Sequence, residues 1–289
     1  MKIKSVLSML VGAMIFSSTA FSEENLPQAR YNPPSPSDVP EKVQKKEGKS
    51  PLLWQDNSVT YLWGKDDQVT THIRQNLTFE HFSLWTWGDL WAFWDNYWFN
   101  GGSTQNGNHW YYGEITPRFS FGKLTGKDLS FGPVKDVLLA VSYQYGQGDV
   151  EAFRVGPGFD FDIPGFNFAQ LNILYIKPEG NRHASGSWML NPVWSITFPV
   201  GRSDILFDGF MDWTINNRSD SSDPSRNYHA NLHFNPQIKY DLGKLMKIGE
   251  KHLYVGVEYN YWSNKYGIKD SSHFDTNQSS TSLLIKYHF

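Results

Sequence analysis

The chain has 289 residues, with 20 Phe, 15 Tyr, 12 Trp, no cysteine and a formal net charge of -3. The lack of cysteine excludes a fold held by disulfides, and this charge gives no electrostatic footprint for nucleic acid. The mean hydropathy is -0.50, and beyond the N-terminal segment no apolar run reaches membrane-spanning length, which excludes a helical membrane protein. A secreted soluble protein or a transmembrane β-barrel remains, and the aromatic excess favours the barrel, because barrels concentrate aromatic side chains in two interfacial girdles.

The N-terminus has the features of a secretory signal peptide. Two lysines precede an apolar run over residues 6–16, and Ala20 and Ser22 place small side chains at the two positions that a signal peptidase reads. The apolar run is about half of the length that a membrane anchor needs. We therefore expect residues 1–22 to be a signal peptide cleaved after Ser22.

Residues 23–52 have the composition of a flexible periplasmic leader. They contain six prolines, and the stretch 41–49 carries four Lys and two Glu. Such a segment cannot bury enough apolar surface to order itself, so we expect it to be disordered. A contact of its lysines with peptidoglycan or a partner stays open as an alternative.

Residues 53–289 show a repeated pattern of aromatic-rich alternating segments, separated by clusters of turn residues. The pattern predicts an all-β protein, a transmembrane antiparallel β-barrel of about twelve strands with a disordered N-terminal leader. The expected strands cover 54–64, 70–83, 88–99, 109–121, 134–146, 152–162, 166–177, 187–198, 203–214, 228–241, 251–263 and 278–289. Twelve is even, as a single-chain bacterial barrel requires when both termini face the periplasm.

The C-terminus is the sharpest local signal. Apolar side chains occupy every second position from Leu283 to Phe289, with Lys286 and His288 between them. This ending resembles the terminal strand that outer-membrane barrels present to the barrel assembly machinery, so we expect that partner to contact Phe289. An ordinary terminal strand of a soluble sandwich is the alternative.

The period of two also assigns faces to the strands. In the segment 88–99, Asp89, Trp91, Phe93 and Asp95 share one face, which should line the lumen because a carboxylate facing lipid is costly. The same rule turns a further set of side chains inward: Arg74, Asn76, Thr78, Glu80, Glu114, Thr116, Arg118, Asp208, Phe210, Asp212, Tyr254, Glu258, Asn260 and Trp262.

An interior with rings, acids and bases can offer a flat solute both stacking faces and hydrogen-bonding edges. We therefore expect passive diffusion of a small polar solute past weak sites. The candidate lumen residues are Arg74, Glu80, Asp89, Trp91, Phe93, Asp95, Glu114, Arg118, Asp212 and Glu258. The alternative is that Arg74, Glu80, Glu114 and Arg118 form ion pairs that brace a filled barrel. No cofactor, metal or catalytic residue is predicted, although the acidic loop 220–223 leaves calcium open.

One stretch of the chain resembles a known family. The residues that carry the resemblance are Glu114-Ile115, Pro117-Arg118-Phe119-Ser120, Lys123-Leu124-Thr125 and Asp128-Leu129-Ser130-Phe131-Gly132-Pro133, with shorter matches in order from Ile73-Arg74 to Tyr266-Gly267-Ile268-Lys269-Asp270. They are similar to the Tsx-like nucleoside-specific channel proteins, including the OmpK outer-membrane proteins, over roughly 70–289.

The resemblance implies a monomeric outer-membrane barrel of a Gram-negative bacterium, surrounded by lipid and lipopolysaccharide. It further implies a narrow lumen for nucleosides or deoxynucleosides, and loops that phages or colicins exploit. By motif position it carries over Arg74, Glu80, Asp89, Asp95, Glu114 and Arg118 as lumen residues. The chain departs from the family at Asn76 and Thr78, where the nucleoside channels tend to place an acid and a tyrosine.

Two other functions compete with a channel. An outer-membrane phospholipase would need a His and a Ser in hydrogen-bond reach, but His229 and His233 would lie about 13 Å apart on one strand and have no evident Ser partner. A structural or adhesive barrel with a plugged lumen is the second alternative, because the pattern does not show whether side chains meet across the interior.

Overall fold

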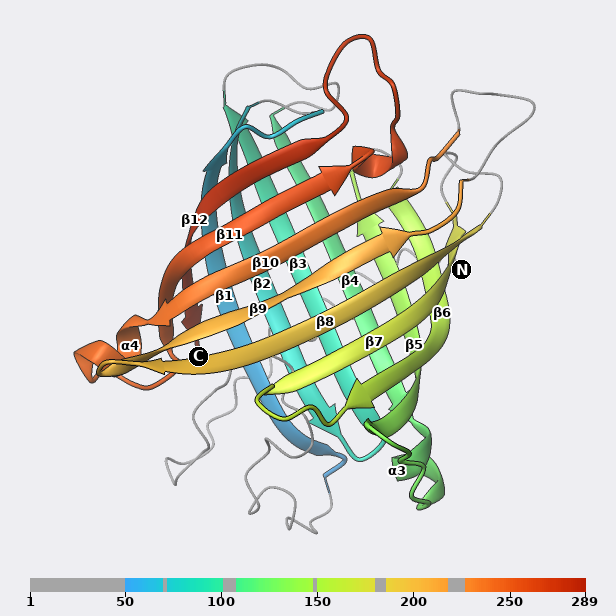
Figure 1. Ribbon diagram of the computed structural model, residues 1–289, viewed down its shortest axis with the longest axis vertical. Coiled ribbons are helices and arrows are strands. Elements are labelled where there is room, and N and C mark those ends of the chain that lie inside the picture. The colour runs from blue at the N-terminus through green and yellow to red at the C-terminus, as the bar shows by residue number, and fades with distance from the viewer. Residues whose placement is uncertain (1–49, 70–71, 101–107, 148–149, 180–185, 218–226) are drawn as a thin grey trace.

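The computed structural model describes residues 50–69, 72–100, 108–147, 150–179, 186–217 and 227–289. Antiparallel strands form a closed barrel in which each strand pairs with its neighbours in sequence and β1 pairs with β12 (Figure 1). The predicted all-β barrel of twelve strands is confirmed. The expected signal peptide, the leader up to residue 49 and the acidic loop 220–223 lie outside the described residues.

The strand bounds lie close to the predicted ranges. The strands are β1 Leu52–Lys65, β2 Ile73–Trp85, β3 Gly88–Asn100, β4 His109–Ser120, β5 Val134–Gly146, β6 Val150–Phe161, β7 Phe168–Pro178, β8 Ser187–Val200, β9 Ser203–Thr214, β10 Asn231–Asp241, β11 Leu253–Ser263 and β12 Gln278–His288. The ranges 134–146 and 203–214 match. The starts of β2 and β10 differ most, because the pairing of these strands begins at Ile73 and Asn231.

Short helices that the alternation does not predict come after two of the strands. They are α3 (Phe121–Thr125), directly after β4, and α4 (Leu242–Met246), directly after β10. The last strand residue caps each helix: the Ser120 side chain accepts a hydrogen bond from the backbone N–H of Lys123, and the Asp241 side chain accepts one from Lys244. The predicted strand 109–121 was therefore wrong at Phe121. A 3-10 turn, η2 (Lys265–Gly267), comes after β11, and no helix in the described ranges is long and apolar enough to cross a membrane.

The C-terminal strand closes the barrel and separates its side chains by face. In β12, Leu283, Ile285 and Tyr287 are exposed on the outside, while Lys286 and His288 are buried inside. The strand pairs with β1 from Ser58↔His288 to Gly64↔Ser282. The alternation read from the sequence is thus the alternation of the barrel wall, and the contact of Phe289 with the assembly machinery stays a prediction.

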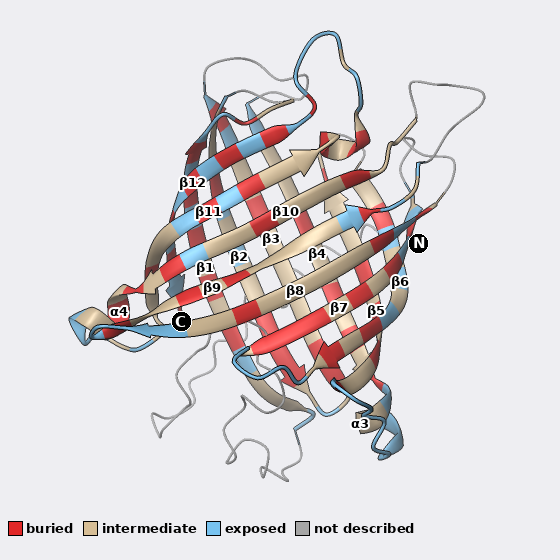
Figure 2. Ribbon diagram, viewed as in Figure 1, coloured by how far each residue is buried: buried red, intermediate tan, exposed pale blue. Residues whose placement is uncertain are grey.

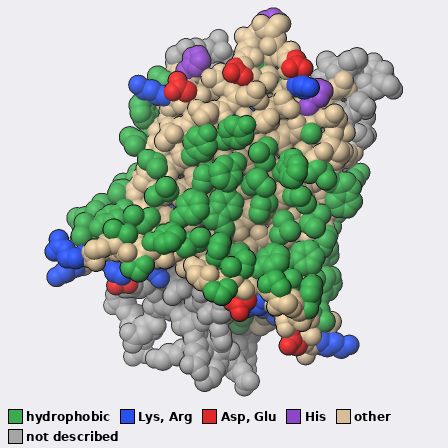
Figure 3. All heavy atoms as spheres, viewed as in Figure 1, with side chains coloured by type: hydrophobic (Ala, Val, Ile, Leu, Met, Phe, Trp, Pro, Cys, Tyr) green, Lys and Arg blue, Asp and Glu red, His purple; other side chains and the backbone are tan. Residues whose placement is uncertain are grey.

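The outer wall is apolar across its middle. Buried and exposed residues alternate along the strands (Figure 2). On the face that Figure 3 shows, hydrophobic side chains cover the wall between two ends where charged side chains gather. An apolar band between charged rims is what hydrocarbon and its two polar interfaces select on the outside of a barrel.

The interior has two unlike walls. Buried apolar side chains on β5 to β8 form one cluster, comprising Ala140, Ala152, Leu174, Ile176 and Met189. On β6, Gly156 lies so close to β7 that an added Cβ would stand 1.9 Å from the backbone oxygen of Ile173. Most of the interior charge lies on the other strands. We call the end of the barrel where β1 begins and β12 ends the terminal end, and the opposite end the loop end.

Candidate functional site

All ten candidate residues lie on the inner side of the strands. Asp89, Asp95, Arg118 and Glu258 are buried, and the other six are partly exposed. Inward placement by period two is therefore observed in the structure. The contacts of these side chains show which of them brace the wall and which remain available to a solute.

Arg118 joins three strands near the terminal end. From β4 it donates to Asp89 on β3 through Nε at 2.9 Å and Nη2 at 2.7 Å, and its Nη1 donates to Asp160 on β6 at 2.8 Å. The side chain of Arg118 is 6% exposed. This two-sided fork is the geometry in which a guanidinium binds carboxylates most strongly.

A second ion pair joins β4 and β6 further toward the loop end. Arg154 Nη1 donates to Glu114 at 3.0 Å, and the hydroxyls of Ser142, Thr116 and Tyr112 also donate to Glu114. Glu114 is therefore held by four donors from three strands. The bracing role is present here and at Arg118.

Two buried lysines hold acids on the other side of the barrel. Lys286 on β12 donates to Glu80 at 2.6 Å, and Trp91 Nε1 donates to the same carboxylate at 2.9 Å. Lys239 on β10 donates to Asp208 at 2.6 Å. Both lysine side chains are essentially unexposed, so each requires its acid as a partner.

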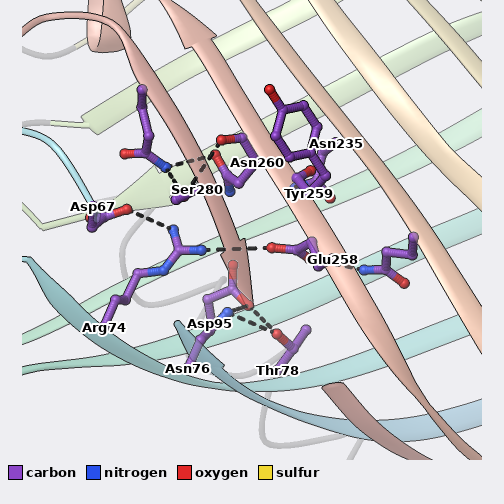
Figure 4. Close-up of polar contacts among 12 residues, drawn as sticks. Asp67, Arg74, Asn76, Thr78, Asp95, Asn235, Glu258, Tyr259, Asn260 and Ser280 are labelled. Carbon is purple, nitrogen blue, oxygen red and sulfur yellow. Dashed lines mark hydrogen bonds and ion pairs between the residues drawn. The ribbon is translucent and has the colours of Figure 1, made fainter. Parts of the chain in front are cut away.

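The loop end carries a chain of charges that Figure 4 shows in part. Arg74 lies between Asp67 at 3.5 Å and Glu258 at 3.6 Å. The ammonium of Lys265, in η2, contacts Asp67 at 3.1 Å and Gln278 at 2.5 Å. The turn after β11 is thereby fastened to the β1–β2 loop.

Asp95 has a different environment from the ion-paired acids. It accepts hydrogen bonds from Asn76 at 3.0 Å and Thr78 at 2.5 Å (Figure 4), and from Tyr97 at 2.6 Å, all neutral groups. Asp212, on β9, accepts from the neutral side chain of Asn191 at 2.7 Å. Among the described residues, neither carboxylate has a cationic partner within salt-bridge distance.

Acids outnumber bases along the inner face. The inward acids of the described strands, apart from Asp136, Asp204 and Asp241 at the turns, are Asp56, Glu80, Asp89, Asp95, Glu114, Asp160, Asp208, Asp212 and Glu258; the inward Lys and Arg residues are Arg74, Arg118, Arg154, Lys239 and Lys286. Nine carboxyl groups therefore face five cations on these strands, besides the histidines His233 and His288.

Aromatic rings line β3 on the inside. Trp91 and Phe93 lie 4.8 Å apart between centroids, Phe93 and Tyr112 lie 5.6 Å apart, and Tyr97 and Phe99 lie 6.2 Å apart. Because Asp89 and Asp95 occupy the same face, rings and carboxylates succeed one another along a single strand. We call Trp91, Phe93, Asp95, Tyr97 and Phe99 the β3 column.

The two histidines of the phospholipase alternative do not share a strand. His229 precedes β10, while His233 lies within it and stacks on Trp262 with centroids 3.9 Å apart. The described residues hold no group of three His, Cys, Asp or Glu side chains that could bind a metal.

A family model described as nucleoside-specific channel-forming protein, Tsx, matches residues 52–289, which include all twelve strands of the barrel. The chain belongs to the Tsx family. The resemblance inferred from residues 114–133 is thereby confirmed, and with it the location in the outer membrane.

The relatives of this Tsx-family chain are distant. The outer membrane protein OmpK of Vibrio parahaemolyticus is 25% identical over 191 residues, covering 65% of this chain and 68% of OmpK. The nucleoside-specific channel-forming protein Tsx of Escherichia coli O157:H7 is 35% identical over 146 residues, so that the match spans 46% of this chain and 49% of that protein. Among solved structures, the KdgM porin aligns with 80% of this chain at 11% identity and a TM-score of 0.45.

Sequence reasoning missed four inner residues of this Tsx-family barrel that the ion pairs require: Arg154, Asp160, Lys239 and Lys286. A signal was present in each case. Lys286, for example, alternates with the lipid-facing Ile285 and Tyr287, so the period of two already placed its side chain inside.

The turn of Lys265 should respond to alkaline pH in this Tsx-family channel. Burial lowers the pKa of Lys265 to about 8, whereas the pKa is about 10.4 when the turn is open and solvated. The open turn therefore binds more protons between these values, and closure should become more favourable as pH rises from about 8 to about 10.

Hydrogen exchange of the segment 264–277, corrected for the intrinsic rate at each pH, should show stronger protection at pH 10 than at pH 7.5. Lys265→Met should remove this pH dependence. Lys269→Met, at a half-exposed side chain, is the matched control and should keep it; a Lys269 variant that also lost the dependence would contradict the assignment to Lys265.

Proposed function

We propose that the protein lets nucleosides diffuse passively across the outer membrane, with the β3 column as the surface on which the base stacks. The family to which the chain belongs is described as nucleoside-specific, and a relative that is 35% identical carries the same description. The observation that carries the proposal is the β3 column, in which rings and a carboxylate share one inner face.

The chemistry of the β3 column suits the two halves of a nucleoside. A base is flat and gains about 1 to 3 kcal/mol from each aromatic contact. Its sugar is rich in hydroxyl donors, and the Asp95 carboxylate between Phe93 and Tyr97 accepts such donors. Weak sites of this kind favour passage over retention, because conduction needs a solute to leave as easily as it enters.

The departure at Asn76 and Thr78 also has a structural counterpart. Both side chains donate to Asp95, and so they hold the carboxylate of the β3 column in place. An acid at position 76 would instead repel Asp95. We therefore propose that the substitutions retune the column and do not remove its acceptor.

Planar bilayers with the purified barrel test the proposal directly. Small current steps should appear and should decrease as adenosine or thymidine is added, because a bound nucleoside obstructs ions. Ribose alone should block more weakly, since it lacks the stacking ring. If nucleosides leave the current steps unchanged, the nucleoside assignment is wrong and the barrel is a channel for another solute. If the barrel carries no current, a plugged lumen is favoured.

A further inference from the structure

The charges on the inner wall of the barrel are unbalanced. Inward carboxyl groups outnumber inward Lys and Arg residues by nine to five, and every one of the five cations contacts a carboxylate. Arg154 also interacts electrostatically with Asp212, beyond salt-bridge distance, and the five cations leave four of the nine acids in excess. What remains is the surplus of acids, of which Asp95 and Asp212 have neutral hydrogen-bond partners only among the described residues.

Asp95 and Asp212 face each other across the lumen. They stand on β3 and β9, which lie six strands apart in either direction around the ring. Tyr112 is the in-register neighbour of Asp95 on β4, and it interacts electrostatically with Asp212 from the opposite wall. The two carboxylates therefore act on the same zone of the interior.

The hydrogen bonds at Asp95 stabilise its charged form. Three donors point at one carboxylate, from Asn76, Thr78 and Tyr97, and by favouring the ionised state they oppose the burial of Asp95, which favours the neutral one. No cation of the protein neutralises the resulting charge at salt-bridge distance within the described residues, so mobile cations are left to do so.

Unpartnered hydrogen-bond acceptors near these acids also favour cations. Among the residues that the structure describes, the Oδ1 atom of Asn76, a residue that is 5% exposed, has no hydrogen-bond partner, and neither has Oδ1 of Asp208 or of Asn172. All three atoms are oxygens that require a donor or a cation. A buried acceptor left without either costs about 1 to 3 kcal/mol, so these three positions favour an occupant that supplies a donor or a cation.

We infer that the lumen is a cation-selective passage, with Asp95 and Asp212 as the residues that select small monovalent cations over anions. Opposed carboxylates are the means by which cation channels raise the local concentration of cations and exclude anions. The inference goes beyond nucleoside transport, since it concerns which ions share the path of an uncharged solute.

The zero-current potential of bilayers under a tenfold KCl gradient tests this selectivity. The wild-type barrel should show the sign of a cation-selective pore, and the effect should weaken as salt increases, because the Debye length falls to about 3 Å at 1 M. The double variant Asp95→Asn/Asp212→Asn should lower the cation-to-anion permeability ratio by at least about twofold.

Two variants make the outcome decisive. Asp128→Asn removes an acid on an exposed turn and should leave the permeability ratio unchanged. Asp212→Asn alone provides a second test if the double variant does not fold, since Asp212 has fewer protein partners than Asp95. A wild-type pore that prefers chloride, or an unchanged ratio in a conducting Asp212 variant, overturns the inference while leaving nucleoside passage intact; a wild-type barrel with no current overturns both.

Discussion

Replacing Arg118 by leucine should destabilise the barrel more than any single change elsewhere in the lumen. The substitution removes the fork that binds Asp89 and Asp160 and leaves two buried carboxylates uncompensated. Breaking a buried ion pair by removing one partner costs about 3 to 5 kcal/mol. Urea unfolding of the refolded protein in detergent, monitored by the shift in electrophoretic mobility between folded and unfolded forms, measures this loss.

Two controls accompany this prediction: one breaks an exposed ion pair, and the other separates the charge of Arg118 from its size. Lys177→Leu breaks an exposed pair with Glu179 and should change the stability by no more than about 1 kcal/mol. Arg118→Leu combined with Asp89→Asn and Asp160→Asn removes the orphaned charges and should recover part of the lost stability. A triple variant as unstable as Arg118→Leu would show that packing, and not charge, explains the effect.

Removing the ring of Phe93 should weaken nucleoside binding strongly and should change the other properties of the channel less. Phe93 lies between Trp91 and Tyr112 in ring contact, so it is the centre of the aromatic surface. Losing one base–aromatic contact costs about 1 to 3 kcal/mol, which raises the nucleoside concentration that halves the current by about 5- to 150-fold.

Phe93→Leu preserves an apolar side chain without a ring and should behave like Phe93→Ala if stacking is the cause. Phe198→Ala removes a ring from the exposed outer wall and should leave the half-blocking concentration unchanged. If Phe93→Leu bound nucleosides as the wild-type protein does, the base would have to contact another surface.

The barrel could be predicted almost entirely from the sequence, because its physical cause is local. Hydrocarbon leaves no partner for an open strand edge, and the period of two assigns every residue of a strand to lipid or lumen. β5 and β9 were therefore predicted to the residue. Helices α3 and α4 escaped this rule, since their cause is a capping side chain at the strand end.

The candidate site was predicted by face but not by partner. Alternation placed Arg118 and Asp89 inside, and their register on neighbouring strands is set by the antiparallel pairing of β3 with β4. The contact of Arg118 with Asp160 joins β4 to β6 across β5, and that of Lys286 with Glu80 joins β12 to β2 across β1. No period along one strand specifies which side chains meet over an intervening strand.

The amino-acid pattern was sufficient to predict the barrel wall, with its twelve strands and its inward acids and rings. Residues 114–133 were sufficient to predict the family. The closed barrel was needed to show which of those acids have a cation as partner. Glu80, Asp89 and Glu114 are neutralised by Lys286, Arg118 and Arg154, whereas Asp95 is held by neutral donors alone among the described residues. The physical reason is that side-chain direction has a local period, while charge neutralisation depends on distances that exist only once the ring of strands has closed.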